Sequence, residues 1–194
     1  MIARTLSILS FIVLAACGNV KKDEAANVIN EPKVTEVPTP GGIIINAQSE
    51  LDTLKGSPKA YAVGKIGTAT FTINYYSPAT RGRMIWGGLV AYDNVWVTGA
   101  HKSTSIEFDH DIKIGETVVT AGKYAFFTIP GKSQWTIILN KNWNQHLADD
   151  YAQAEDVVRL SVVPETEEKH QERLRYVIEA EGENAGEIRG VNTF

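Results

Sequence analysis

Apolar and polar residues alternate along several short stretches of the chain. Phe71, Ile73 and Tyr75 are separated by threonine and asparagine, and this period of two is that of a half-buried β-strand. Residues 104–109, 158–162 and 173–179 alternate in the same way, and residues 124–129 and 135–139 are short β-rich runs. Turn residues, among them Gly115, Gly122 and Pro130, separate these stretches. The pattern predicts about eight short strands and no long amphipathic helix.

This pattern predicts an all-β fold, namely a single antiparallel β-sandwich or jelly-roll-like domain over residues 57–194. A polar, proline-containing stretch precedes the domain and cannot bury enough apolar surface to order itself. We therefore predict a lipidated cysteine and flexible tether over residues 17–56. Within it, Ile43-Ile44-Ile45 is either an added edge strand or an apolar part of the tether, and residues 46–54 are predicted to form a short helix.

The first 16 residues have the layout of a secretory signal. Arg4 precedes an apolar run from residue 6 to residue 16, which is shorter than the roughly 20 residues of a transmembrane helix. The run ends in Leu14-Ala15-Ala16-Cys17, which resembles the lipobox of bacterial lipoproteins. That resemblance implies cleavage before Cys17 and a diacylglyceryl group on its sulfur.

The predicted lipid on Cys17 anchors the protein to a membrane of the bacterial cell envelope, because two or more acyl chains hold a protein stably. We expect the outer membrane, on its periplasmic face or at the cell surface. Lys21-Lys22-Asp23-Glu24 resembles the charged export signals of some surface lipoproteins. The alternative is an ordinary solvated linker.

Composition and charge narrow the possible functions. The chain has a net charge of −4, and loss of Arg4 with the leader leaves 18 basic against 23 acidic residues. This balance argues against a nucleic-acid partner. Cys17 is the only cysteine, so an acylated Cys17 leaves no thiol for disulfides, nucleophilic catalysis or metal binding. No cofactor is expected.

Four residues are candidate ligand contacts. Arg83 belongs to an arginine pair, with Arg81, that could clamp a carboxylate or phosphate or could bridge within the fold. His101 follows Gly99 in a predicted loop, and Trp143 and His146 lie in an amide-rich segment suited to hydroxyl-rich ligands.

A metal site is a separate possibility, because histidine and aspartate side chains bind divalent ions. Its candidate ligands are His101, Asp109, His110 and His146. Their spacing matches no known metal motif, and Asp109 and His110 also fit an ordinary turn.

Several motifs occur together at characteristic spacing between residues 57 and 178. They are Tyr76-Ser77-Pro78, the run 81–90, Tyr92, Val95-Trp96, Thr98-Gly99-Ala100, Thr104-Ser105-Ile106, Ala121-Gly122-Lys123-Tyr124, the run 127–131 and the run 135–140. In these motifs the chain resembles the bacterial domain-of-unknown-function family 2911. The resemblance implies an envelope protein, often a lipoprotein, and carries no established activity or catalytic residues.

The chain departs from this family in two places. Many members have an arginine and a glutamate where Val97 and Lys102 stand, so any role of that pair does not transfer. Members also continue with a further strand after the segment matching Tyr176-Val177-Ile178. The remaining 16 residues imply that this strand is shortened or that its edge is covered by something else.

Three functions remain open. The first is a lipid-anchored, non-enzymatic module that binds a small molecule, a glycan or a protein partner, and it is favoured because no catalytic constellation is evident. The second is a metal-assisted hydrolase that uses His101 and His146. The third is a structural or assembly lipoprotein whose edge strands pair with another envelope protein.

Overall fold

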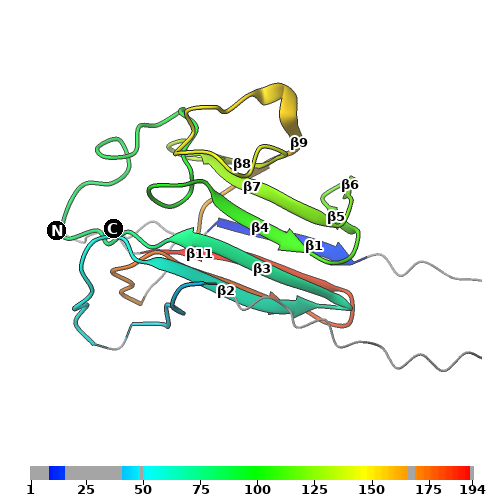
Figure 1. Ribbon diagram of the computed structural model, residues 1–194, viewed down its shortest axis with the longest axis horizontal. Coiled ribbons are helices and arrows are strands. Elements are labelled where there is room, and N and C mark those ends of the chain that lie inside the picture. The colour runs from blue at the N-terminus through cyan, green and yellow to red at the C-terminus, as the bar shows by residue number, and fades with distance from the viewer. Residues whose placement is uncertain (1–8, 16–40, 49, 166–168, 193–194) are drawn as a thin grey trace, which may run out of the picture.

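The strands pair into two antiparallel sheets that pack as a sandwich (Figure 1). The computed structural model describes residues 9–15, 41–48, 50–165 and 169–192. Cys17 and residues 18–40 of the predicted tether lie outside these residues. The described part contains no α-helix and one 3-10 turn, η1 (Gln153–Glu155). The all-β prediction is therefore confirmed.

One sheet has six strands and the other has five. The six-stranded sheet contains, in spatial order, β2 (Lys59–Ile66), β3 (Ala69–Tyr76), β4 (Thr104–Phe108), β7 (Gly122–Ile129), β8 (Trp135–Asn140) and β9 (Asp156–Val162). The five-stranded sheet contains β10 (Arg175–Ala180), β11 (Ala185–Val191), β1 (Leu9–Ala15), β5 (Ile112–Ile114) and β6 (Thr117–Val119).

The main core fills the space between the two sheets. Side chains from both sheets enter it, as a sandwich requires: Phe71 and Ile73 come from β3, and Ile188 comes from β11. Two core aromatic residues, Tyr75 and Tyr176, meet edge to face with ring centroids 4.8 Å apart. The alternation read from the sequence is thus the inward face of each strand.

The edges of the two sheets meet closely where β2 lies beside β10. A Cβ atom on Gly64 would lie 2.6 Å from the Cβ of Ile178, a distance that no side chain tolerates. Gly64 therefore permits the close approach of the two strands. The same glycine explains why the alternation pattern did not predict β2.

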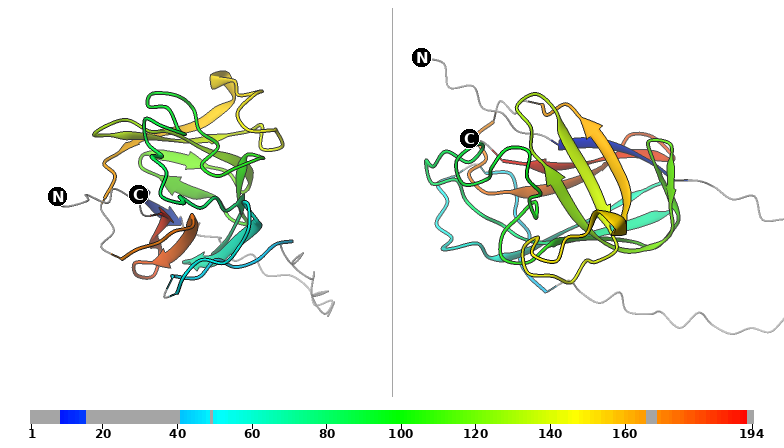
Figure 2. Two further views of the ribbon diagram at one scale, coloured as in Figure 1. Left: turned by 90° about the vertical axis from the view of Figure 1, so that its left-hand side faces the viewer. Right: turned by 90° about the horizontal axis from the view of Figure 1, so that it is seen from above.

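A second, smaller apolar cluster lies on the outer face of the six-stranded sheet. It contains Val97, Ala125, Phe127 and Ile138. Val97 lies in the long connection from β3 to β4, residues 77–103, which is green in Figures 1 and 2. Because this connection covers the outer face, β7 and β8 are buried on both sides.

For the C-terminal part of the chain the sequence left two alternatives, a shortened strand or an edge covered by something else. A full strand, β11, follows β10 and pairs with it from Arg175 opposite Val191 to Ala180 opposite Gly186. The other edge of β11 pairs with β1, so the blue and red strands lie side by side in Figures 1 and 2. The apolar run that the sequence assigns to the leader is therefore a central strand of this sheet.

Residues 41–48 and 50–56, which the sequence analysis assigns to the tether, contact the sandwich. Ile43 bridges to Ala60 of β2 in parallel, and Ile45 is buried in the main core. The predicted helix over residues 46–54 is wrong, because the described residues of this segment have no helical turn. Gln48 and Asp52 instead bond to residues more than 120 positions away, and these long-range contacts override local helix propensity.

Candidate functional site

A buried arginine fixes one end of the sandwich. Arg173 is 1% exposed, and its guanidinium donates to the Asp52 carboxylate at 2.8 Å and to three backbone oxygens, those of Leu54, Gly56 and Ser77. A planar guanidinium with five donors suits such a ring of acceptors. Arg173 therefore ties the segment 52–56 to the end of β3.

The ion pair with Arg173 compensates the negative charge of Asp52. Burial alone would raise the pKa of Asp52, but the hydrogen bond from Arg173, the N–H of Leu54 and the positive charges of Arg173 and Arg81 lower it below its ordinary value. Asp52 is consequently ionised at neutral pH, and its charge is neutralised locally by Arg173.

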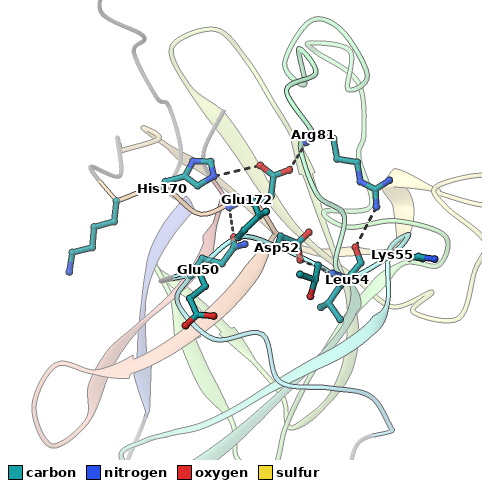
Figure 3. Close-up of a pocket in the computed structure, with 11 residues that line it drawn as sticks. Glu50, Asp52, Leu54, Lys55, Arg81, His170 and Glu172 are labelled. Carbon is teal, nitrogen blue, oxygen red and sulfur yellow. Dashed lines mark hydrogen bonds and ion pairs between the residues drawn. The ribbon is translucent and has the colours of Figure 1, made fainter.

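Glu172, the residue before this arginine, is also held by its neighbours (Figure 3). Its carboxylate accepts hydrogen bonds from the Thr80 hydroxyl at 2.8 Å and from the backbone N–H of Arg81. The His170 Nε2 lies 3.6 Å from the same carboxylate. Arg81 has a φ of 50°, a left-handed conformation in which Glu172 holds its backbone.

These residues surround a cavity of about 950 Å³, open to solvent, at this end of the molecule. Its volume is within the range of small-molecule sites. The lining includes Glu50, Asp52, Lys55, Arg81, His170 and Glu172 (Figure 3). The cavity thus has charged side chains in its lining, and the buried Arg173 bonds to two of the lining residues, Asp52 and Leu54.

Three of the rim side chains are available to a ligand. Within the part of the chain that the structure describes, the carboxylate of Glu50 and the ammonium of Lys55 have no hydrogen-bonding partner, and the guanidinium of Arg81 has only a long 3.5 Å contact with the Leu54 carbonyl. In Figure 3 the Arg81 side chain points toward Leu54. Because Asp52 is already paired, the free groups are two cations and one anion, a set that favours an anionic ligand.

The four residues predicted to contact a ligand do not line this cavity. Arg83 donates from Nε to the Thr80 carbonyl at 2.9 Å and from Nη2 to the Ala79 carbonyl at 2.7 Å. Its guanidinium therefore stabilises its own turn, whereas its neighbour Arg81 faces the cavity.

The other three predicted ligand contacts lie in two adjoining loops. The backbone of His101 accepts a hydrogen bond from Leu147 at 2.9 Å, and Lys102 bridges to His146. The imidazole of His101 packs edge to face on Tyr76, with centroids 5.1 Å apart, and that of His146 contacts Asp149 at 2.8 Å. These contacts bring the His101 and His146 loops together without forming a shared ligand set.

Trp143, which the sequence placed in a polar loop, is 40% exposed. The ammonium of Lys123 lies 4.3 Å from the centroid of its ring, a cation–π contact. The backbone carbonyl of Trp143 accepts a hydrogen bond from the Ser103 hydroxyl at 2.6 Å. Trp143 thus helps to hold the loop against the sheet.

The candidate metal ligands are divided between the two ends of β4. His101 precedes this strand and Asp109 and His110 follow it. Asp109 accepts hydrogen bonds from the His110 ring and from the N–H of Thr70; these bonds lower its pKa, although burial acts in the opposite direction. Among the described residues, no group of three or more histidine, cysteine, aspartate or glutamate side chains could hold a metal ion.

The cavity could not be predicted from the sequence, because two residues on which it depends carry no local signal. Arg173 occupies a polar position in an alternating run, where an arginine normally faces solvent. Its partner Asp52 is 121 residues away, in a segment assigned to the tether. The one signal that pointed here was the arginine pair, of which Arg81 and not Arg83 faces the cavity.

Comparison with known proteins places the chain in a family but does not supply an activity. No curated protein and no solved structure matches it. Among the described residues, no helix has the length and apolar character needed to cross a membrane. The family described as Protein of unknown function (DUF2911) matches residues 57–189, which include most of both sheets, and the chain therefore belongs to this family.

Proposed function

We propose that this protein is a lipid-anchored bacterial envelope protein whose β domain binds a small, hydroxyl-rich acid in the cavity beside Arg81. The observation that carries the binding role is the cavity itself, with the cationic side chains of Arg81 and Lys55 in its lining. The lipobox-like run before Cys17 supports the anchor. In this proposal the cavity binds its ligand, and no catalytic step is assigned to it.

The charged groups of Arg81, Lys55 and Glu50 suggest which class of ligand the cavity would bind. The guanidinium of Arg81 can donate two parallel hydrogen bonds to a carboxylate, and Lys55 adds a second positive charge. Glu50 offers an acceptor for ligand hydroxyl groups. A sugar acid presents both a carboxylate, which Arg81 can bind, and a ring of hydroxyls, and it is therefore the ligand class to test.

Glucuronate and glucose are suitable probes, because they share a ring and differ at one carboxylate. Isothermal titration calorimetry is expected to detect glucuronate binding and much weaker glucose binding. Arg81→Met is expected to weaken glucuronate binding about 10- to 100-fold, the effect of losing a charged hydrogen bond. Lys65→Met, which removes an exposed cation from β2, is the matched control and should change nothing.

Equal binding of glucose and glucuronate, or equal loss in the Arg81 and Lys65 variants, would contradict this assignment of the cavity. The anchor is tested separately by the mass of the N-terminal peptide of the protein purified from membranes. An acylated Cys17 at the N-terminus supports the proposal, whereas an unmodified cysteine within an intact leader contradicts it.

A further inference from the structure

The five-stranded sheet depends on a strand that the predicted leader supplies. β1 pairs with β11 from Leu9 opposite Gly190 to Leu14 opposite Ala185, and with β5 from Val13 opposite Ile114 to Ala15 opposite Ile112. In the part of the chain that the structure describes, no other strand joins the pair β10–β11 to the pair β5–β6. If residues 1–16 are removed, this sheet loses its middle strand.

The resulting slot is too wide to close without a rearrangement. Neighbouring strands lie about 4.8 Å apart, so loss of the middle strand leaves β11 and β5 about 10 Å apart, beyond hydrogen-bonding distance. The N–H and C=O groups on both facing edges would lose their partners, and unpaired strand edges are templates for another strand.

The walls of the slot are apolar on the core side. Ile112 and Ile114 of β5 and Ile188 of β11 are each at most 2% exposed in the intact sheet. Because directly opposite residues of antiparallel strands point to the same face, an occupant needs apolar residues at alternate positions. It must also be extended over about six residues, the length of the ladder with β11.

We infer that, in the processed protein, this slot accepts an extended segment of a partner envelope protein with apolar residues at alternate positions. The segment adds a strand between β11 and β5 and so completes the sheet, which is recognition by strand addition. The inference rests on the leader cleavage that the proposed function includes. It concerns β5 and β11, none of whose residues lines the cavity beside Arg81.

Two other occupants fit the slot less well. Residues 18–40 of the chain carry Pro32, Pro38 and Pro40 and have no three apolar residues at alternate positions, and proline is excluded from central strands. A second copy would have to insert a free strand, but each strand that the structure describes already belongs to a sheet. A free segment of a different protein meets both requirements.

The test compares two forms of the full protein by amide hydrogen exchange. One is the mature lipoprotein purified from membranes in detergent, and the other is the full-length Cys17→Ala chain, which cannot be acylated and keeps residues 1–16. Amides of β11 and β5 are expected to exchange at least tenfold faster in the mature form, while those of β3 and β7 stay protected in both. The probe is a synthetic peptide of residues 9–15 with flanking lysines, and a Val13→Pro peptide is its control.

The inference predicts that the peptide restores protection of β11 and β5 in the mature protein and that the Val13→Pro peptide does not. Slow exchange of both strands in a monomeric mature protein without peptide would overturn it, because the sheet would then close by itself. Protection that appears only in a dimer would also overturn it, in favour of a second copy. An intact mass that still includes residues 1–16 would refute leader cleavage and with it the slot, whereas a cleaved protein with a closed sheet would refute the slot alone.

Discussion

Replacing Arg173 by alanine tests whether this buried side chain holds the segment 52–56 beside the cavity in place. The guanidinium is almost fully buried and makes one ion pair with Asp52 and three hydrogen bonds to the carbonyls of Leu54, Gly56 and Ser77. Removing it leaves a carboxylate and three backbone acceptors without their donor. Breaking a buried ion pair in this way costs about 3–5 kcal/mol.

The assay is urea unfolding of the full-length Cys17→Ala chain, which keeps residues 9–15 and therefore the middle strand of the five-stranded sheet. With a slope of about 2 kcal/mol per molar urea, the Arg173→Ala variant should lose about 2 M in its unfolding midpoint. Arg173→Lys should recover only part of this loss, because an ammonium cannot reach all four acceptors in the plane of the guanidinium.

A double-mutant cycle separates the ion pair from the backbone contacts. Asp52→Ala in the Arg173→Ala background removes the unpaired carboxylate, so the double variant should be more stable than additivity predicts, by about 1–3 kcal/mol. A midpoint shift below about 0.5 M in Arg173→Ala, or strict additivity in the cycle, would refute the view that Arg173 holds the segment 52–56 in place.

Three further predictions concern pH dependence and packing. The pKa of Asp52 is lower in the folded protein than its unfolded value of about 3.9. The stability that the Asp52 carboxylate contributes is therefore fully present above about pH 4 and is lost as the pH falls toward the folded pKa. Asp52→Asn should flatten the pH dependence of the urea midpoint below about pH 4, and an unchanged slope would contradict this. Tyr176→Phe removes the 2.6 Å hydrogen bond to the Thr98 carbonyl, which keeps a second donor, so thermal unfolding should show a loss of only about 1 kcal/mol. Phe127→Ala should cost about 3–5 kcal/mol in urea unfolding, because the outer-face cluster buries this ring completely, whereas a loss below about 1 kcal/mol would mean that the cluster does not pack.

Much of the fold was predictable because most strands bury one face. The alternation in β3, β4 and β9 and the apolar runs in β7 and β8 follow directly from burial on one or both sides. β2 was missed because Gly64 interrupts its pattern, and the glycine is required by a neighbour far away in the sequence. Local patterns report which face a strand buries, but not which strand lies against it.

The candidate site was less predictable for the same reason. The cavity lining and the Arg173 contact that supports it involve segment 50–55, Arg81 and residues 169–173. These segments are far apart in the chain and have no common motif. His101 and Trp143 were predicted as ligand contacts from their residue type. In the structure they pack against Tyr76 and Lys123, respectively. Residue type indicated possible chemistry, whereas the position of the cavity depended on long-range hydrogen bonds.

The N-terminal apolar run shows how one sequence feature can satisfy two physical demands. A leader needs a short apolar segment, and a strand slot flanked by Ile112, Ile114 and Ile188 needs the same composition in extended form. Residues 9–15 meet the second demand only as long as they remain attached. If cleavage before Cys17 removes them, the apolar residues and the strand edges of β11 and β5 would lose their partner strand. Cleavage at the anchor would then determine when the β domain becomes able to bind a partner through these edges.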